Sequence, residues 1–384
     1  MKQKVLVEMS GGVDSSVAAL LMKNEGYEVI GVFMKCFSDT KDPLTGECNW
    51  RGERRMAAKI ASLLDIPLHT VDFEKEYKSL IIKEMINSYK KGITPNPDVD
   101  CNNKVKFPLL WKVAKKYKCD YLVTGHYARV RRGDFLKKCP PTRSESLDEA
   151  APSRELPGMN YKLLRAKAEN KDQSYFLYRL NQNDLSHTIF PIGNYTKDEV
   201  REIARKNKFP NFDKKGTSGI CFIGNINVKN YLKKQIKPKK GKILDPEGNV
   251  IGEHDGIYFY TVGERIGPRH GIEFEKKGDD KKLVRKWYVA RKNVKKNELV
   301  LAPEGHVLNF RKEIVVKDLH LISEKELPLK VNVRIRHVGE LLPAVYSKSR
   351  SKIILDKAIT GVSEGQAIVF YKGEICVGGG VIGF

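Results

Sequence analysis

The stretch VLVEMSGGVDSSVAALLMKN, residues 5–24, decides the fold of this chain. A short apolar strand at residues 4–7 leads into a turn with Gly11 and Gly12, and apolar side chains then recur at helical spacing over residues 15–24. Adjacent glycines let the backbone approach a ligand and expose successive N–H groups, and a helix N-terminus favours an anion. The order strand, loop, helix therefore predicts an anion cradle rather than a plain tight turn. It is not a Walker A loop, because no lysine follows a second glycine.

The pattern of the first 125 residues extends this unit. β-Branched and aromatic segments indicate strands, and amphipathic segments that alternate with them indicate helices. The strand segments are residues 27–34, 67–73 and 121–124, and the helical segments are residues 52–64, 74–90 and 107–117. Strands separated by helices of this length predict an α/β fold with a parallel sheet, and a ligand at the carboxyl ends of the strands.

The composition changes twice farther along the chain. Residues 131–160 are rich in Pro, Ser and Glu and poor in apolar residues, which indicates a flexible surface insertion. Beyond residue 226 the chain is rich in lysine, and later it consists of short strand-like pieces separated by turns. We therefore expect an α/β domain at residues 1–225, a small lysine-rich central domain at 226–285 and a C-terminal all-β barrel at 286–384.

The net charge is the strongest global feature. The chain has 70 Lys and Arg against 47 Asp and Glu, a formal charge of +23, whereas solubility of a small domain requires a magnitude of only about 2–8. This excess favours a polyanion partner, and because no amphipathic anchor helix is evident, nucleic acid is favoured over an anionic membrane. No stretch approaches the roughly 18 apolar residues of a membrane span. The first strand begins at once, which leaves no room for a signal peptide and predicts a cytoplasmic protein.

The cysteines divide into two groups. The seven cysteines are scattered and odd in number, and no C-x-x-C pair occurs, which argues against a disulfide scaffold and a zinc knuckle. A lone cysteine is most often a small buried hydrophobe. Cys101 and Cys221 differ because they lie in the polar, turn-forming segments NPDVDCN and GTSGICF. The Cys101 thiol precedes a helix expected to start near Lys106, and with Lys104 also nearby its pKa is predicted to be lowered.

Several segments resemble a known family in order and spacing. The loop SGGVDS is similar to the pyrophosphate loop of ATP pyrophosphatases that adenylate a carbonyl oxygen. Taken together, the segments resemble the tRNA-specific 2-thiouridylases (the MnmA/TrmU family). The matching segments are residues 9–18, 94–102, 124–130, 170–180, 218–224, 252–256 and 378–383. The departures from the family pattern are Glu8, Gly216, Thr217, Glu264 and residues 265–267.

The resemblance implies a tRNA-uridine 2-sulfurtransferase. With ATP and Mg²⁺, such an enzyme adenylates the wobble uridine of tRNA, because an AMP ester departs far more readily than a carbonyl oxygen. Cys221 would carry a persulfide received from a cysteine desulfurase or a sulfur-relay protein. Cys101 would act as the nucleophile that releases the sulfur, leaving a transient Cys101–Cys221 disulfide. Asp98 would act as acid or base, would cap its turn, or would do both.

The resemblance also implies the contacts of each substrate. The ATP-binding set is Glu8, Met9, Ser10, Gly11, Gly12, Val13, Asp14, Ser15, Met34 and Gly125. Asp14 would lie near Mg²⁺, which it would hold through the pyrophosphate. The tRNA-binding set is Asn96, Pro97, Asp98, His126, Lys171, Asp172, Gln173, Ile335, Arg336 and Gln366. The expected partner is a tRNA with a wobble uridine, of the Lys, Glu or Gln type, and no membrane.

Three other classes remain open at this point. A pyrophosphatase-loop ligase acting on a small molecule explains the loop but neither the charge nor the paired cysteines. A non-catalytic RNA-binding protein does not need Cys101 and Cys221. A thiolase that depends on an iron–sulfur cluster normally needs three clustered thiols, and Cys36 or Cys48 would have to fold nearby.

Overall fold

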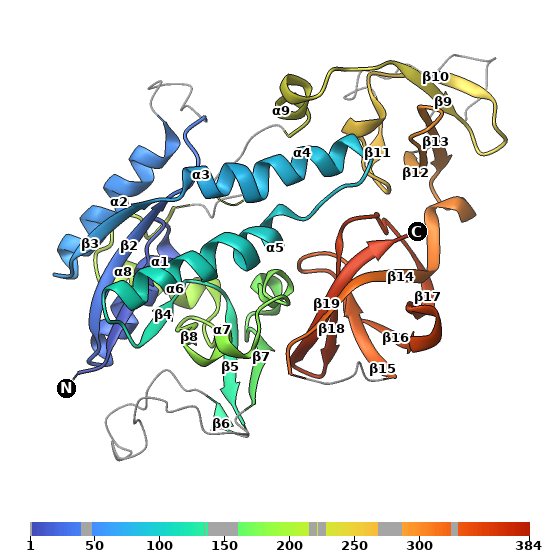
Figure 1. Cartoon of the computed structure of the whole chain (residues 1–384). Helices are drawn as coiled ribbons and strands as arrows, with labels where there is room; N and C mark the ends of the chain where they lie inside the picture. Colours follow the sequence, from blue (N-terminus) through green and yellow to red (C-terminus); the bar gives the residue numbers. More distant parts are fainter. Residues whose placement is uncertain are drawn as a thin grey trace.

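The computed structural model describes residues 2–39, 48–133, 135–136, 160–214, 221, 228–267, 286–323 and 329–384. A parallel sheet, a second sheet and a β-barrel follow one another along the chain (Figure 1). Most of the insertion expected at residues 131–160 lies outside the described residues, although Arg131 and Arg132 belong to a strand. Among the described helices, none combines the length and apolar character needed to cross a membrane.

The N-terminal unit contains the expected parallel sheet, with strand order β3-β2-β1-β4-β8. Its strands are β1 (Lys4–Glu8), β2 (Glu28–Lys35), β3 (Leu68–Asp72), β4 (Tyr121–Val123) and β8 (Thr188–Ile189). All four neighbouring pairs are parallel, which confirms the α/β prediction. The carboxyl ends of β1 and β4 lie next to each other in the sheet, so the loops that follow them share one edge.

Helices cover both faces of this sheet. Val5 and Val7 of β1 pack against α1 (Val13–Asn24), α2 (Asn49–Leu63) and α8 (Lys197–Lys206). Leu6, between them, points to the opposite face and packs in a second cluster with the helices of residues 74–116. Side chains on successive strand residues alternate between faces, so a strand buried on both sides reads as a continuous apolar run.

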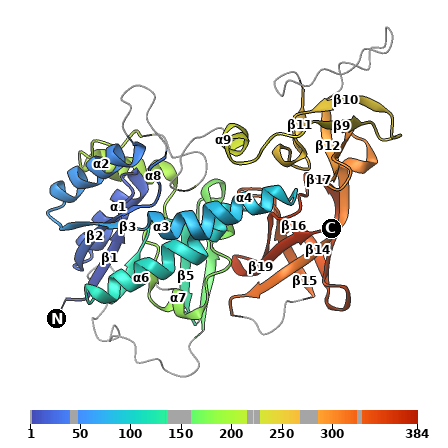
Figure 2. The ribbon, with the colours of Figure 1, turned by 45° about the horizontal axis from the view of Figure 1, so that its top comes forward.

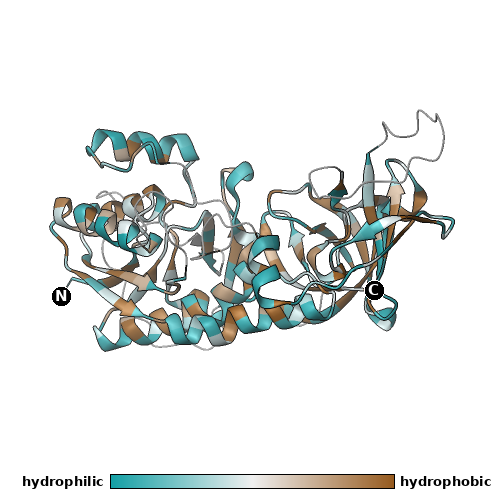
Figure 3. Ribbon diagram, turned by 90° about the horizontal axis from the view of Figure 1, so that it is seen from above, coloured by the Kyte–Doolittle hydropathy of each residue, from teal (hydrophilic) through white to brown (hydrophobic). Residues whose placement is uncertain are grey.

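Two composite helices form the second layer. The first joins α3 (Glu74–Tyr77), a π-helical segment (Lys78–Ile82) and α4 (Lys83–Lys90). The second joins α5 (Pro97–Cys101), a π-helical segment (Asn102–Lys106) and α6 (Phe107–Lys116). In the view from above, these helices carry alternating hydrophilic and hydrophobic turns, as helices with one buried face do (Figure 3).

The second composite helix corrects one prediction. It begins at Pro97, where Pro suits the first helical position and the Asn96 side chain caps the N–H of Val99. The helix start expected near Lys106 is therefore wrong, and Cys101 lies inside the helix. A π-helical segment follows Cys101 directly, and such segments are frequent at functional sites.

The central unit is a five-stranded sheet with strand order β10-β9-β13-β12-β11. Its strands are β9 (Gly241–Leu244), β10 (Val250–His254), β11 (Arg265–Ile266), β12 (Trp287–Asn293) and β13 (Glu298–Pro303), and α9 (Val228–Gln235) packs on its core. β13 pairs with β9, so residues 287–303 belong to this sheet and not to the barrel. The boundary expected at residue 285 does not follow this pairing, and we propose a central domain of residues 226–303 instead.

The C-terminal unit is a barrel of six antiparallel strands, closed by pairing between β14 and β19. The strands are β14 (Phe310–Leu321), β15 (Lys330–Arg334), β16 (Leu342–Ser347), β17 (Lys352–Thr360), β18 (Ala367–Lys372) and β19 (Ile375–Gly383). This confirms the all-β prediction. Closure removes the sheet edges and encloses an apolar core that includes Val333, Ile353 and Phe370.

The barrel is joined to the N-terminal unit by main-chain pairing. β19 also pairs with β7 (Tyr161–Arg165), which pairs in turn with β5 (Ala128–Arg132), and β6 (Phe135–Leu136) completes this sheet. The short helix α7 (Gln182–Ser186) follows nearby in the chain. In the second view the barrel lies beside β5 and α4, at the end of the molecule away from the N-terminus (Figure 2). The barrel therefore reaches the carboxyl edge of the parallel sheet.

Candidate active site

The loop between β1 and α1 is a pre-formed cradle. Gly11 has φ of +78°, and a Cβ there would lie 2.4 Å from the carbonyl oxygen of Glu53, so this position requires glycine. The loop is fixed by hydroxyls: Ser15 Oγ donates to Gly12 O (3.1 Å), and Ser16 Oγ donates to the same oxygen (2.9 Å). Ser15 Oγ also accepts from the N–H of Ser10 (3.2 Å). The predicted anion cradle is thus held in place without a ligand.

The carboxylate of Asp14 lies at the open side of this cradle between two groups that sequence reasoning missed. Its Oδ1 accepts from the hydroxyl of Tyr127 (2.8 Å) and from Nζ of Lys197 (2.6 Å). Lys197 is the first residue of α8, and a capping box of Thr196 and Glu199 fixes that helix end. The capping box was visible in the sequence, but nothing in the sequence indicated that it lies beside the loop.

A third segment closes the cradle from the other side. Asn211 is buried, and its Nδ2 donates to Gly11 O (3.1 Å) and to Ser16 Oγ (3.0 Å). Lys214 pairs with Glu53 and also contacts Gly11 O (3.4 Å). Oδ1 of Asn211 is buried and has no hydrogen-bond partner among the described residues. The loop therefore combines a helix N-terminus with two nearby lysines, Lys197 and Lys214, which suits a phosphate-bearing ligand.

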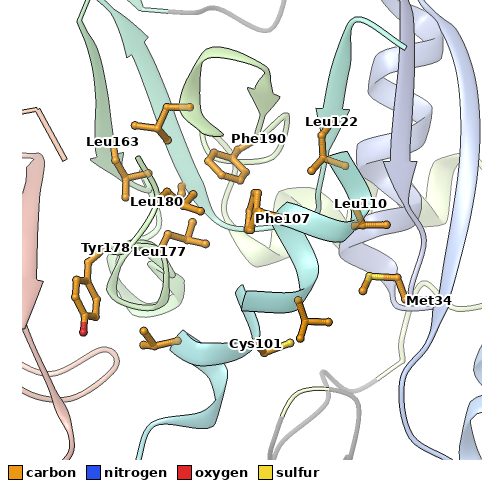
Figure 4. Close-up of a cluster of buried hydrophobic side chains, with 14 of the residues drawn as sticks. Met34, Cys101, Phe107, Leu110, Leu122, Leu163, Leu177, Tyr178, Leu180 and Phe190 are labelled. Atoms are coloured by element: carbon orange, nitrogen blue, oxygen red, sulfur yellow. The ribbon is translucent and has the colours of Figure 1, made fainter. Parts of the chain in front are cut away.

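The remaining residues of the predicted ATP set differ in their surroundings. Met9, Val13 and Met34 are buried, and Met34 is the penultimate residue of β2, near the carboxyl edge of the sheet (Figure 4). Gly125 follows β4, and a Cβ there would lie 2.7 Å from the backbone nitrogen of Ser15. The Glu8 side chain is buried and does not line the loop; it lies near Lys106.

The two predicted cysteines come together although they lie far apart in the sequence. The thiol of Cys101 is fully buried and hydrogen bonded to the side chain of Cys221. Oδ1 of Asp98 accepts from the N–H of Cys221 (2.8 Å), and the hydroxyl of Tyr77 donates to the Cys221 carbonyl. Tyr77 is a further residue that the sequence did not point to. Cys101 is the last residue of α5, in the first part of the composite helix, on the side that faces Met34 (Figure 4).

Burial reverses the predicted acidity of Cys101. The hydrogen bond with Cys221 and burial raise the pKa of the Cys101 thiol well above its usual range, and Lys106 offsets this only in part. The lowered pKa expected from helix and lysines is therefore wrong for the resting protein. Burial likewise raises the pKa of Asp98, although the hydrogen bond from Cys221 opposes this shift. An Asp98 carboxyl that is easier to protonate is suited to acid–base chemistry.

The loop expected to contact tRNA is instead partly a structural joint. Asp172 is 0% exposed, and its Oδ2 accepts from Nη1 of Arg334 in the barrel (2.7 Å). The Asp172 carboxylate is therefore engaged inside the protein, and its contact with tRNA stays a prediction. Gln173 accepts from the N–H of Tyr127 (2.9 Å), whereas Lys171 is exposed. Of this trio, only Lys171 has the exposure expected of an RNA contact.

His126 and the barrel residues were also expected at the RNA surface. His126 is buried, with its ring near Phe107, and burial together with Lys106 lowers its pKa well below the usual range. Ile335 is buried too, while Arg336 is exposed. Gln366 donates from Nε2 to the carbonyl oxygens of Thr94 (3.0 Å) and Pro95 (2.8 Å). Gln366 thus holds the segment that leads into Asn96, Pro97 and Asp98.

Some predictions fall on residues outside the described ranges. These are residues 216–220 and 222–224 of the second cysteine segment, and residues 268–285 of the lysine-rich region beyond residue 226. Within the described residues, no group of three or more His, Cys, Asp or Glu side chains is arranged to hold a metal ion. Cys48 donates its thiol to Ser38 O (3.2 Å), and Cys36 is buried.

Comparison with known proteins places this arrangement in a class. The tRNA methyl transferase HUP domain model matches residues 3–225, the tRNA methyl transferase PRC-barrel domain model residues 229–303, and the aminomethyltransferase beta-barrel domain model residues 311–382. The protein is therefore of the class in which a HUP domain with a nucleotide-type loop is followed by two β domains. The model boundary at residue 303 agrees with the strand pairing of β13.

Full-length relatives narrow the class to one family. The tRNA-specific 2-thiouridylase MnmA of Lactobacillus helveticus is 37% identical over 391 residues, covering 99% of this chain and 95% of that protein. The MnmA of Nitrosomonas europaea is 38% identical, covering 99% of this chain and 98% of that protein. The MnmA of Clostridioides difficile is 36% identical, covering 100% and 98%. This chain belongs to the tRNA-specific 2-thiouridylase family.

Proposed function

We propose that this chain is a tRNA-uridine 2-sulfurtransferase that adenylates the wobble uridine of tRNA with ATP and then introduces sulfur to give 2-thiouridine. The observation that carries the proposal is the pair of thiols, Cys101 and Cys221, hydrogen bonded beside Asp98. A ligase acting on a small molecule has no use for this pair. A non-catalytic RNA-binding protein has no use for it either.

ATP binds in the cradle of residues 9–15, where the glycines let the backbone approach and its N–H groups donate to the phosphate oxygens. The 2-oxygen of the uridine attacks the α-phosphorus, and pyrophosphate leaves. Lys197 and Lys214 neutralise the phosphate charge from opposite sides of the loop. Asp14 is the residue that would hold Mg²⁺, through the pyrophosphate, and the ion would supply positive charge against the departing pyrophosphate.

Sulfur transfer follows at the thiol pair. The terminal sulfur of a Cys221 persulfide attacks carbon 2 of the uridine, and AMP leaves with the original oxygen. The Cys101 thiolate then attacks the Cys221 sulfur, so that the sulfur–sulfur bond to the nucleoside breaks and 2-thiouridine is released. The product is a Cys101–Cys221 disulfide, which an external thiol reductant returns to two thiols. Asp98 accepts and returns the protons of these steps while it holds the N–H of Cys221.

The proposal also names partners and place. The persulfide comes from a cysteine desulfurase or a sulfur-relay protein, and the tRNA carries a wobble uridine of the Lys, Glu or Gln type. A cytoplasmic location follows from this substrate. The net charge of +23 supports binding of a large anion.

Nucleoside analysis of bulk tRNA from cells with and without the gene tests the proposal. We expect wobble 2-thiouridine to disappear with the gene and to return with the wild-type gene. The Cys221→Ser gene should not restore it. Unchanged 2-thiouridine in the deleted strain would reject the proposal, provided that no second copy of the gene is present.

A further inference from the structure

A buried ion pair connects the ATP loop with the thiol pair. Glu8 is the last residue of β1 and is 4% exposed, and Lys106 ends the π-helical segment after Cys101 and is 6% exposed. Oε2 of Glu8 lies 3.9 Å from Nζ of Lys106, at the outer limit of an ion pair. Burying two charges costs more free energy than such a long contact contributes, so a gain in stability does not account for the pair.

The surroundings of Lys106 indicate what its charge acts on. Its ammonium interacts electrostatically with the sulfurs of Cys101, Cys221 and Cys36, in addition to Glu8. Burial by itself lowers the pKa of Lys106, but Glu8 and the three sulfurs outweigh burial and raise it, so the side chain stays charged. The other titratable groups that face Lys106 are the carboxyl of Asp98 and the ring of His126.

The neighbouring lysine provides a contrast. Lys104 is on the same π-helical segment, but it is half-exposed and pairs with Asp100 at 2.8 Å, four residues earlier. A surface pair of this kind contributes little to the electrostatics of a buried thiol, because water screens it. The two lysines that the sequence placed beside Cys101 are therefore not equivalent, and only Lys106 is enclosed with the sulfurs.

We propose that Lys106 is the fixed positive charge that favours the thiolate of Cys101 in the step that frees Cys221, and that Glu8 limits this effect by sharing the same ammonium. Lys106 keeps its own protons; the thiol proton of Cys101 passes to Asp98, as proposed above, and the sulfur exchange needs no redox cofactor. Lys106 is thus a positioning residue for sulfur chemistry. This inference rests on the proposed function, because that function is what requires a Cys101 thiolate.

A two-step reaction with a small aromatic disulfide isolates the Cys101 step, without tRNA or ATP. The reagent first reacts at half-exposed Cys221, forming a mixed disulfide and releasing one thiol. The Cys101 thiolate then attacks the Cys221 sulfur, forming the Cys101–Cys221 disulfide and releasing a second thiol. The rate of the second release against pH has a midpoint that reports ionisation of Cys101, and peptide mass spectrometry identifies the bond. The Cys101→Ser variant must lack this phase.

The two variants of the pair are expected to shift this midpoint in opposite directions. Lys106→Met should raise it by about one to three pH units, the range for loss of an adjacent opposite charge. Glu8→Gln should lower it, because the ammonium is then shared only with the sulfurs. Lys104→Met, the matched control, should leave it unchanged. An unchanged midpoint in Lys106→Met, or an upward shift in Glu8→Gln, would overturn the inference.

A folding failure of Lys106→Met does not leave the question open. That variant leaves the buried Glu8 carboxylate without an opposite charge. The double variant Glu8→Gln/Lys106→Met removes both charges, so it can be compared with Glu8→Gln to test Lys106. Its midpoint should lie above that of Glu8→Gln alone, and equal midpoints would contradict the inference. Parallel thiolation assays separate the two proposals: shifted midpoints in a protein that never thiolates tRNA reject the function, whereas normal thiolation with unshifted midpoints rejects the role of Lys106.

Discussion

At the residue scale, Asp98 combines a structural and a chemical task. Its Oδ1 holds the N–H of Cys221, and burial raises the pKa of its carboxyl. An amide can perform the structural task, since its oxygen accepts the same hydrogen bond. An amide does not, however, take up or return a proton near neutral pH. The pair of substitutions to Asn and Ala therefore separates the two tasks.

We expect Asp98→Asn to keep the Cys101–Cys221 contact and to lose thiolation by about 10²–10⁴-fold, the usual worth of general acid–base catalysis. Asp98→Ala should lose both the Cys101–Cys221 contact and thiolation. The measurements are the rate of 2-thiouridine formation and the rate of Cys101–Cys221 disulfide formation with a small disulfide. Near-normal thiolation by Asp98→Asn would leave Asp98 with only its structural task.

Residues that neighbour each other in the chain were the ones that the sequence could predict. Gly11, Gly12 and Asp14 belong to one continuous loop, so their pattern in the sequence was enough to predict the anion cradle. Tyr127 and Lys197 reach Asp14 only through the fold, and no local pattern marks them. The Asp172–Arg334 contact was not predictable either, because the local sequence around a polar residue is the same whether its side chain meets solvent or a buried arginine.

At the element scale, the composite helix that carries Cys101 depends on the barrel. The segment before it is held by Gln366, and Thr94 Oγ1 also lies 3.1 Å from Thr261 Oγ1 of the central unit. Gly365 has φ of +88°, and a Cβ there would lie 2.2 Å from a methyl group of Ile93. All three units therefore meet at the residues that lead into Asp98 and Cys101.

We expect Gln366→Leu to slow thiolation about tenfold at saturating tRNA and ATP, because two hydrogen bonds to carbonyls are lost at roughly 1 kcal/mol each, with partial compensation by water. Gln366→Glu should behave alike, since a carboxylate cannot donate to Thr94 O and Pro95 O. The ATP dissociation constant should not change in either variant. A change confined to KM for tRNA would instead favour the base contact that the sequence predicted.

Strand pairing between distant segments explains what the sequence did not fix at this scale. Strand-like pieces from residue 287 onward were correctly expected, yet which sheet each joins depends on partners such as β9, β7 and β14. Short strands with alternating patterns do not reveal which strand they pair with. The sequence therefore indicated a barrel but not which strand begins it.

At the scale of the whole molecule, a line of polar contacts runs from the barrel to the ATP loop. Arg334 binds Asp172, the adjacent Gln173 binds the backbone of Tyr127, and the Tyr127 hydroxyl binds Asp14. Arg334 is 3% exposed, and its guanidinium also lies over the Tyr371 ring at 5.3 Å. Loss of Arg334 would leave the buried Asp172 carboxylate with only the longer contact to Arg165 Nε (3.5 Å).

We expect Arg334→Met to lower the free energy of unfolding by about 3–5 kcal/mol. The double variant Asp172→Asn/Arg334→Met should lose less, because it strands no charge. Denaturant unfolding followed by circular dichroism measures both. A loss below about 1 kcal/mol in the single variant would mean that water reaches the pair and that the contact does not join the two units.

The distribution of lysines gives a second prediction at this scale. Lys234 and Lys239 are exposed on and just after α9, whereas Lys233 is already paired with Asp255. If the first two contact phosphates, Lys234→Gln/Lys239→Gln should flatten the log–log salt dependence of tRNA binding by about 0.7–0.9 per lysine. Lys2→Gln, at the amino edge of the parallel sheet, is the control and should not change it. An unchanged slope in the double variant would mean that Lys234 and Lys239 do not contact phosphates and that tRNA binds elsewhere on the protein.

The central claim is that ATP and the thiol pair act on one uridine. Nucleoside mass spectrometry of a purified tRNA, after incubation with the enzyme, ATP and a persulfide donor, tests it together with a count of the AMP released. The account predicts 2-thiouridine at the wobble position and one AMP for each 2-thiouridine. The Cys221→Ser enzyme should form neither product, although it still binds tRNA. Formation of 2-thiouridine without ATP, or by the Cys221→Ser enzyme, would contradict it.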